Sequence, residues 1–344
     1  MTRRMVVRAA LAAASIVAVP GPAAAQRFES VGVRAQGMGG AFVAVANDAT
    51  ASWWNPAGLA GGSYVELLVE AAGHHQPRSA RGEDAASLPA WRDSVRAVAV
   101  GMPALAFSYY RLRISEIQPN LPTVETSAGR QGTGTGEVRL RSLAFGQFGA
   151  TVGQSLGEHV VLGTTLKLVR GRLGVAVRPA ADASLDAADG LDGRSETHGD
   201  LDVGALAVVG RVRVGAALRN VTSPTFSDGA DRVEVPRQAR VGVALAAGRQ
   251  RPDDLTVAVD ADLTTTTTAT GDDRRLAAGL EAWLPNRIVA VRGGFRVQTT
   301  GTARPAFSGG ASLVLRRGVF VDGAIAGGSD GGSRGWSAGL RLSY

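Results

Sequence analysis

Apolar and polar residues alternate with a period of two along most of the chain from about residue 63 onward. In one such segment Leu255, Val257 and Val259 alternate with Thr256 and Ala258. This period predicts β-strands, because successive side chains of a strand point to opposite faces. The polar faces carry small residues and isolated charges, with few of the long Lys and Glu side chains that solvate a wet sheet. The pattern therefore favours a transmembrane barrel over a soluble β-sandwich.

Turn signals divide this part of the chain into fourteen expected strands. We place them at residues 63–73, 94–101, 104–116, 138–152, 160–175, 199–209, 212–221, 238–247, 255–265, 275–283, 288–298, 306–315, 319–326 and 335–344. The connections alternate between short ones, such as 210–211 and 316–318, and long ones, such as 117–137 and 176–198. Outer-membrane barrels have tight periplasmic turns and longer outer loops, whereas a sandwich has no reason to sort its loops. We expect an all-β fold, a 14-stranded antiparallel transmembrane β-barrel over residues 63–344, with both ends in the periplasm.

The N-terminus has the order of regions found in secretory signal peptides. Arg3, Arg4 and Arg8 precede an apolar stretch over residues 9–19, and Ala23-Ala24-Ala25 offers a cleavage site. The alternative, a membrane anchor, needs a longer apolar stretch. We expect residues 1–25 to be removed, which lowers the formal net charge from +7 to +4.

Composition narrows the class of protein further. The chain has 46 glycines in 344 residues, 45% hydrophobic residues and no cysteine. The hydrophobic content is too high for disorder, and the missing cysteine excludes disulfide scaffolds and Cys-ligated metal sites. No apolar run after the signal peptide is long enough for a transmembrane helix. The sequence has no block of basic residues with interleaved aromatic residues, which is the pattern that indicates nucleic-acid binding. We expect the outer membrane of a Gram-negative bacterium.

Residues 26–62 lack the long alternation and are rich in glycine and alanine. Asn55-Pro56 indicates a helix start, with Asn as N-cap and Pro at the first helical position. Gly37, Gly39 and Gly40 superficially suggest a phosphate loop, but the strand, helix and ribose-binding acid of such a site are missing. The segment is too short to fold alone, so we expect it to sit inside the barrel.

The same segment resembles the N-terminal region of the FadL-type outer-membrane proteins, and in detail the shorter PorV/PorQ-like branch. The resemblance is sharp over residues 31–62. It rests on Gly37, Met38, Gly39, Gly40, Asn47, Asp48, Asn55, Pro56, Ala57 and Gly58. It implies a 14-stranded barrel whose N-terminal hatch, residues 26–62, plugs the lumen. The chain is shorter than typical fatty-acid transporters, and none of their ligand-contacting residues is carried over.

The last expected strand ends in a pattern typical of a barrel assembly signal. Leu340, Leu342 and the terminal Tyr344 share its apolar face with Trp336. The alternative is a chance aromatic terminus, which the alternation disfavours. We therefore expect the barrel assembly machinery and outer-membrane lipid as partners.

Charged residues are expected on the lumen face of several strands. They are Lys167, Arg213, Arg219, Asp260, Asp262, Arg292, Arg296 and Arg341. They either tune a passage or form a satisfied polar core in a plugged barrel, and the second interpretation is favoured because unpaired buried charges are costly.

Catalytic and metal chemistry find little support. The four histidines, His74, His75, His159 and His198, fall in expected loops or turns without ligand spacing, and no nucleophile with a positioned base can be proposed. An acidic loop over residues 182–200 either binds Ca²⁺ or, as we prefer, is solvated. We expect no enzyme, no cofactor and no metal.

Three functions remain open for the predicted barrel. The first is passive transport of small hydrophobic or amphipathic molecules through a rearranged hatch or a gap in the wall. The second is a PorV-like role, in which the outer loops receive secreted protein cargo. The third is a structural barrel. An apolar groove near the outer loops or hatch would favour transport, and a filled lumen with exposed loops would favour the interaction role.

Overall fold

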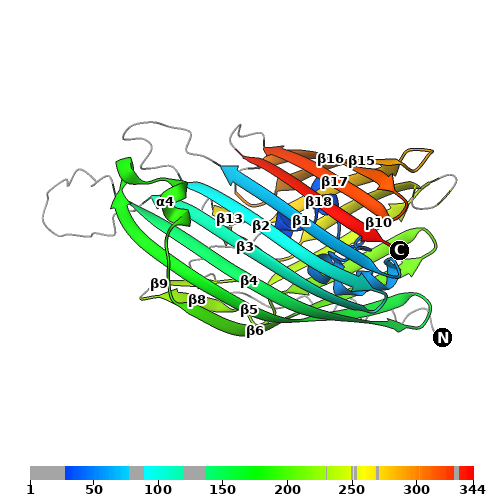
Figure 1. The fold of residues 1–344 in the computed structure, drawn as a ribbon, viewed down its shortest axis with the longest axis horizontal. Coiled ribbons are helices and arrows are strands. Elements are labelled where there is room, and N and C mark those ends of the chain that lie inside the picture. Colours follow the sequence, from blue (N-terminus) through cyan, green and yellow to red (C-terminus); the bar gives the residue numbers. More distant parts are fainter. Residues whose placement is uncertain are drawn as a thin grey trace, which may run out of the picture.

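The computed structural model describes residues 28–76, 89–119, 137–229, 231–248, 251, 254–268, 271–301, 303–328 and 333–344. The expected signal peptide, residues 1–25, lies outside them. Fourteen strands of the described residues close into one antiparallel barrel, in the order β1-β18-β17-β16-β15-β14-β11-β10-β7-β6-β5-β4-β3-β2 (Figure 1). The predicted fold class is confirmed.

The barrel strands match the fourteen expected segments in order, with shifted ends. They are β1 (Glu66–Gln76), β2 (Ala90–Met102), β3 (Leu105–Pro119), β4 (Glu137–Leu156), β5 (Val160–Pro179), β6 (Ser195–Val209), β7 (Val212–Arg219), β10 (Gln238–Ala246), β11 (Leu255–Asp262), β14 (Arg275–Trp283), β15 (Val289–Gln298), β16 (Pro305–Arg316), β17 (Val319–Gly328) and β18 (Arg334–Ser343).

The first and last strands close the barrel. β1 pairs with β18 from Glu66–Ser343 to His75–Arg334, and with β2 on its other edge. The backbone of Tyr344 continues the seam, because its N–H donates to the Val65 carbonyl at 2.9 Å. The C-terminus lies at the end of the barrel with the short turns, and the long connections gather at the other end (Figure 1). We call these the short-turn end and the long-loop end.

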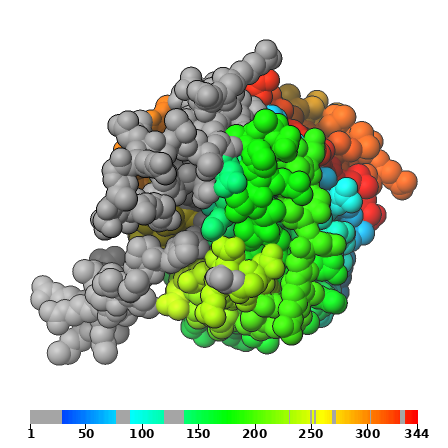
Figure 2. Space-filling model, turned by 90° about the vertical axis from the view of Figure 1, so that its left-hand side faces the viewer, coloured from blue at the N-terminus to red at the C-terminus, as the bar shows by residue number. Residues whose placement is uncertain are grey.

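The wall is taller on one side than on the other. β4 and β5 have 20 residues each, whereas β7 and β11 have 8. β6 pairs with β7 only from Val203–Leu218 to Val209–Val212, so its first eight residues stand beyond that ladder. β3–β6 therefore form a tall wall at the long-loop end, seen end-on in Figure 2 beside the β8–β9 region.

Three long connections contain structure that the alternation did not predict. The connection after β5 holds η4 (Ala180–Asp182) and α4 (Leu185–Asp189), which packs on β2–β4. The connection after β7 forms the hairpin β8 (Thr225–Asp228)–β9 (Asp231–Glu234), and that after β11 forms β12 (Thr266–Thr268)–β13 (Gly271–Asp273). These strands have only three or four residues, too few for a period to show.

The apolar side chains divide between two surfaces. Outward positions such as Val243, Leu280 and Leu313 are exposed. Inside, one apolar cluster joins residues of the N-terminal segment, among them Trp53, to inward residues of the tall wall and to Phe226 of the β8–β9 hairpin. No helix in the described part of the chain is long and apolar enough to cross a membrane.

Candidate functional site

The hatch lies inside the barrel, near the short-turn end (Figure 1). Its described part consists of η1 (Phe28–Ser30), α2 (Val33–Gly37), α3 (Ala51–Trp54) and η2 (Pro56–Gly61). From residue 29 to 59 every residue is buried except Arg34 and Asn47, which are partly buried. Such short helical pieces are unstable alone. The barrel wall must therefore supply the contacts that hold them.

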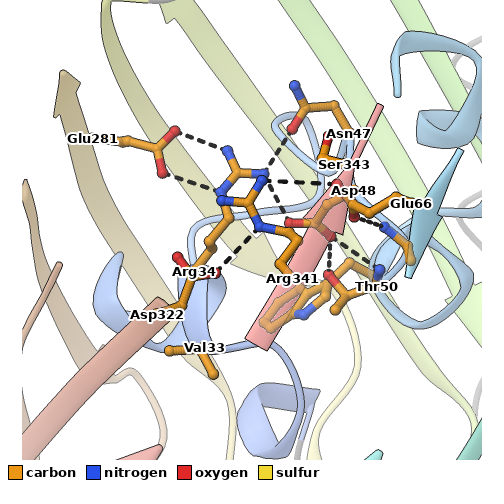
Figure 3. A network of polar contacts seen from close by, with 12 residues as sticks. Val33, Arg34, Asn47, Asp48, Thr50, Glu66, Glu281, Asp322, Arg341 and Ser343 are labelled. Atoms are coloured by element: carbon orange, nitrogen blue, oxygen red, sulfur yellow. Dashed lines mark hydrogen bonds and ion pairs between the residues drawn. The ribbon is translucent and has the colours of Figure 1, made fainter. Parts of the chain in front are cut away.

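Arg34 joins the hatch to the wall through a two-pronged ion pair (Figure 3). Its Nη2 and Nε donate to the two carboxylate oxygens of Glu281 on β14 at 2.8 and 3.1 Å. Its Nη1 donates to Asp48 at 2.8 Å and to Asn47 at 2.9 Å, so it also ties two parts of the hatch together. Paired charged hydrogen bonds of this kind are stronger and more directional than single neutral ones.

The pair continues into the wall as the Arg34 network, whose members are Arg34, Asp48, Glu66, Glu281, Arg292, Asp322 and Arg341. Arg292 Nε lies 2.5 Å from Glu281, and Arg341 Nε lies 3.2 Å from Asp322. Arg341 Nη1 is 3.7 Å from Glu66. All of these side chains are at most 12% exposed. Three guanidinium groups thus face four carboxylates in a site with little water.

A second ion-pair group holds the start of the hatch. Glu29 pairs with Arg240 on β10, and its other oxygen lies 2.8 Å from Arg275 on β14. Arg240 Nε is also 2.5 Å from Asp262. Burial alone would raise the pKa of Glu29, but the two guanidinium groups outweigh burial and hold that pKa well below its usual range. Glu29 is therefore ionised at neutral pH.

Carboxylates of the wall also bind the backbone of the hatch. Glu70 accepts from the N–H groups of Gly32 and Val33 at 2.6 and 3.1 Å. Asp260 accepts from Phe42 and Val43 at 2.7 and 2.8 Å. These bonds satisfy donors that short helices and turns leave open. The first half of the hatch, residues 28–48, is thus held mainly by charges.

The second half, residues 49–62, is held mostly by neutral groups. Ser52 Oγ lies 2.7 Å from the hydroxyl of Tyr110 on β3, and Thr165 on β5 donates to the Ser52 carbonyl at 3.2 Å. Trp53 packs edge-on against Tyr110 with ring centroids 5.1 Å apart. Two contacts are exceptions: Glu66 accepts from the N–H of Ala49 at 2.7 Å, and the guanidinium of Arg219 lies over the ring of Trp53. The two halves of the hatch therefore differ in the strength and kind of their attachment.

Asn55 connects both halves of the hatch to the wall. Its Nδ2 donates to the carbonyls of Val43 and of Ala205 on β6 at 2.9 and 3.0 Å. Its Oδ1 accepts from Ala57 at 3.1 Å, which makes it the N-cap of η2, with Pro56 at the first helical position. The helix start expected at Asn55-Pro56 is confirmed, as a 3₁₀ turn.

We expect Asn55→Ala to lower the free energy of unfolding by about 1–3 kcal/mol, because it removes three hydrogen bonds that are buried or partly buried. Denaturant unfolding of the refolded barrel measures this. Asn286→Ala is the matched control, since Asn286 caps an exposed turn with the same kind of bond. Equal unfolding midpoints for the two variants would contradict the expectation.

Lys167 forms a third buried ion group, between the hatch and the long-loop end. Its Nζ lies 2.6 Å from Asp200 and 2.5 Å from Asp202 of β6 and donates to Asn220 at 2.8 Å. Arg219 lies beside it, with its guanidinium 3.5 Å above the ring of Trp53. The geometry is that of a cation–π contact.

Each of the eight charged residues expected in the lumen lies on an inward-facing position of its strand. Arg292, Arg341, Asp260 and Asp262 belong to the contacts that hold the hatch. Lys167 and Arg219 belong to the third group, while Arg213 and Arg296 are only partly buried. Whether any of them tunes a passage stays a prediction.

Sequence reasoning missed several partners of these residues. Glu66, Glu70, Glu281 and Asp322 lie on the inward faces of expected strands, so the same period of two would have found them. Glu29 and Arg34 lie in a segment without a period, and the sequence held no signal for them.

The space beside the hatch is polar. A small pocket, with a volume of about 20 Å³, opens next to the Glu29 pair. Its lining residues are Glu29, Gln238, Arg240, Asp262, Thr264, Thr266, Asp273 and Arg275. A pocket of this size has room for about one water molecule and not for a hydrophobic ligand.

The expected positions of three histidines are wrong. His74 and His75 belong to β1 and His198 to β6, because both strands extend further into the long connections than the alternation indicated. His74 points inward and its Nδ1 lies 3.0 Å from Asp93, whereas His75 is exposed on the outer face. The two side chains cannot share a metal. No group of three metal-ligating side chains occurs among the residues that the structure describes.

The carboxylates of the acidic connection after β5 form ion pairs with arginines. Arg92 Nη1 lies 2.8 Å from Asp186 and 2.9 Å from Asp189, and Arg172 is 3.4 Å from Asp192. These ion pairs fasten α4 to the outer face of the tall wall. They are a better account of the acidic residues than a Ca²⁺ site, and the segment is more ordered than a solvated loop.

Comparison with protein families decides where the chain belongs. The family described as "F plasmid transfer operon, TraF, protein" matches residues 36–262, which covers most of the hatch and the barrel as far as β11. The chain belongs to this TraF family. No curated protein matches the TraF-family chain by sequence.

Solved structures share the fold of the TraF-family chain at low identity. The toluene transporter TbuX of Ralstonia pickettii is 14% identical, with a TM-score of 0.59 over 92% of this chain and 99% of the transporter. The monoaromatic hydrocarbon channel CymD is 13% identical, with a TM-score of 0.61 over 92% and 98% of the two chains. A FadL homologue of Pseudomonas aeruginosa is 12% identical, with a TM-score of 0.58 over 91% and 97%. The FadL-type fold expected from the resemblance is confirmed.

The last strand of the TraF-family chain has the expected faces. Leu340 and Tyr344 are exposed on the outer face of β18, Leu342 is partly exposed, and Trp336 is 52% exposed further along the strand. Reading of this face by the assembly machinery stays a prediction.

Proposed function

We propose that this chain spans the outer membrane and lets small hydrophobic or amphipathic molecules cross it without covalent chemistry. The observation that carries the proposal is the closed 14-stranded barrel with a hatch inside it, the fold of the hydrocarbon channels above. A closed barrel pairs its backbone groups between strands, and its outward apolar side chains suit lipid.

The route we propose runs along the tall wall. The inner faces of β3–β5 carry apolar side chains beyond the hatch, with Leu112, Leu143 and Phe145 buried there, next to the ion group of Lys167 on β5. The β8–β9 hairpin covers them, and Phe226 stacks on Phe145 with centroids 6.4 Å apart. A hydrophobic solute that displaced this hairpin would meet these apolar side chains, pass the Lys167 ion group and then reach the second half of the hatch.

The attachment of the hatch supports this route. Residues 28–48 are fixed to β10 and β14 by buried ion pairs and to β1 and β11 by hydrogen bonds from backbone N–H groups to carboxylates. Residues 49–62 face the tall wall with mostly neutral contacts. Moving the second half breaks fewer charged contacts, so we propose that it opens and that the first half stays in place.

Uptake into lipid vesicles tests the proposal. We expect vesicles that contain the chain to accumulate labelled oleate and labelled toluene faster than empty vesicles. Phe226→Ser should raise the rate further, because the hairpin loses its apolar anchor. Phe307→Ser, a lipid-facing change at a residue that is 63% exposed, is the matched control. Uptake no faster than in empty vesicles would overturn the proposal.

A second candidate function is a PorV-like role at the cell surface. Its support is the filled lumen, since hatch and hairpin occupy the described interior, together with a built surface of α4 and the tall wall (Figure 2). Stoichiometric co-purification of one exported protein from intact cells, without hydrophobic uptake, would favour this role over transport.

A further inference from the structure

Three outward arginines form a row across the tall wall, and we call Arg96, Arg111 and Arg170 the arginine row. Arg96 on β2 lies directly opposite Arg111 on β3, Arg111 lies opposite Gly146 on β4, and Gly146 lies opposite Arg170 on β5. All three arginine side chains are exposed. The row therefore crosses four neighbouring strands at one level.

The row next to it, on the side of the short-turn end, is apolar throughout. Val98, Tyr109, Phe148 and Leu168 are paired across the same four strands. They are 44%, 48%, 50% and 56% exposed. The outer surface thus changes from apolar to basic within one step of the strand period. In a membrane-spanning barrel such a step marks the boundary between hydrocarbon and headgroups.

Arg96 and Arg111 have no acidic partner among the described residues, although they lie directly across from each other. Like charges at opposite positions of an antiparallel pair destabilise the sheet. Among the described residues, Arg170 Nε donates to the Ser195 hydroxyl, at 3.0 Å. A bound anion between these side chains would turn the repulsion into attraction.

The arginines further from the apolar row are already engaged. Arg92 pairs with Asp186 and Asp189, Arg113 donates to the Asp189 carbonyl at 3.0 Å, and Arg172 pairs with Asp192. The acidic connection after β5 therefore serves these arginines and leaves the row at the apolar boundary to another partner.

The surface beside the arginine row leaves space for a ligand and carries a further hydrogen-bond donor. Gly146, between Arg111 and Arg170, has no side chain, and the Tyr109 hydroxyl leans toward it, 3.0 Å from where a Cβ would stand. Guanidinium groups bind phosphate through paired hydrogen bonds, and a tyrosine hydroxyl adds one more.

We propose that the arginine row binds the phosphate group of a membrane lipid in the leaflet at the long-loop end, with the lipid chains on the apolar row. This inference rests on the proposed membrane location of the barrel. The lipid is a phosphorylated one rather than a carboxylated one, because two guanidinium groups one strand apart match the three oxygens of a phosphate.

The test compares Arg96→Gln/Arg111→Gln with the wild-type chain in neutral detergent, using native mass spectrometry to count bound lipid A, a diphosphorylated glycolipid. The double variant should bind roughly 25-fold more weakly, about fivefold for each arginine near the headgroups. Arg316→Gln/Arg317→Gln removes the same charge from an exposed turn at the opposite end and should bind like the wild type.

Further arms separate the outcomes. Dephosphorylated lipid A should bind the wild type and the double variant alike, and millimolar inorganic phosphate should not displace lipid A. The inference would be overturned if Arg96→Gln/Arg111→Gln bound lipid A as tightly as the wild type and the control variant do. Full displacement of lipid A by phosphate would overturn it as well. Membrane fractionation of cells that express the wild-type chain tests the location separately. A chain absent from the membrane fraction would refute the proposed function, whereas a membrane-bound chain without preference for phosphorylated lipid refutes only this inference.

Discussion

Replacing Arg34 with methionine is expected to loosen the hatch and to lower the free energy of unfolding by about 3–5 kcal/mol, as removal of one partner from a buried ion pair does. The loss follows from the charge balance of the Arg34 network. Without Arg34, four buried carboxylates face only Arg292 and Arg341. Asp48 and Glu281 each lose an ion pair at 2.8 Å.

Two readouts check this prediction. Denaturant unfolding reports the stability of the barrel, and ion conductance in a planar lipid bilayer reports displacement of the hatch. Arg34→Lys should be intermediate, since an ammonium keeps the charge but not the two-pronged geometry. Arg317→Met, at an exposed turn, is the control for loss of one arginine.

A double variant tests whether Arg34 and Glu281 stabilise the protein as a pair. Arg34→Met/Glu281→Gln removes one charge of each sign, so it should be less destabilised than the sum of the two single variants. Strict additivity, or an Arg34→Met protein with wild-type stability and no conductance, would show that the network does not hold the hatch.

Placing a side chain at Gly163 is expected to push the second half of the hatch out of its seat. Gly163 faces inward on β5, and a Cβ there would overlap the backbone of Pro56 and Ala57. Gly163→Val suits the strand itself, because valine is a good β-former. Overpacking of this kind costs about 1–3 kcal/mol.

The readout for Gly163→Val is passage through the barrel. We expect higher conductance and faster uptake of labelled oleate, with all fourteen strands kept, as circular dichroism would show. Gly323→Val on β17 is the control, since nothing lies within 4 Å of its Cβ position. A Gly163→Val barrel that stays as closed as the control would mean that the second half of the hatch does not gate the lumen.

The strands could be predicted from the sequence because one face of each meets a different environment from the other. The period of two is visible over Leu255–Asp262. It is not visible over β8 and β9, because four residues each are too few for a period. The expected strand also ended at residue 73, whereas β1 continues through His74 and His75 to Gln76.

The hatch contacts were harder to foresee, for a physical reason. Glu281 could be assigned to the lumen from its strand, but its partner Arg34 lies 247 positions away in a segment without periodicity. Likewise, a glycine of the wall such as Gly163 can be told from a turn glycine only when the backbone opposite it is known. The sequence supports the existence of the hatch, whereas its seat depends on the three-dimensional contacts.

The ion pairs of the hatch have a consequence for the order of folding. Residues near the N-terminus, Glu29 and Arg34, bind Arg240, Arg275 and Glu281, which are made late in synthesis. The seam between β1 and β18 joins positions as far apart as Glu66 and Ser343. Contacts over such separations form slowly. We infer that the hatch gathers the C-terminal strands around itself before the seam closes, and thereby acts as an internal template for closure.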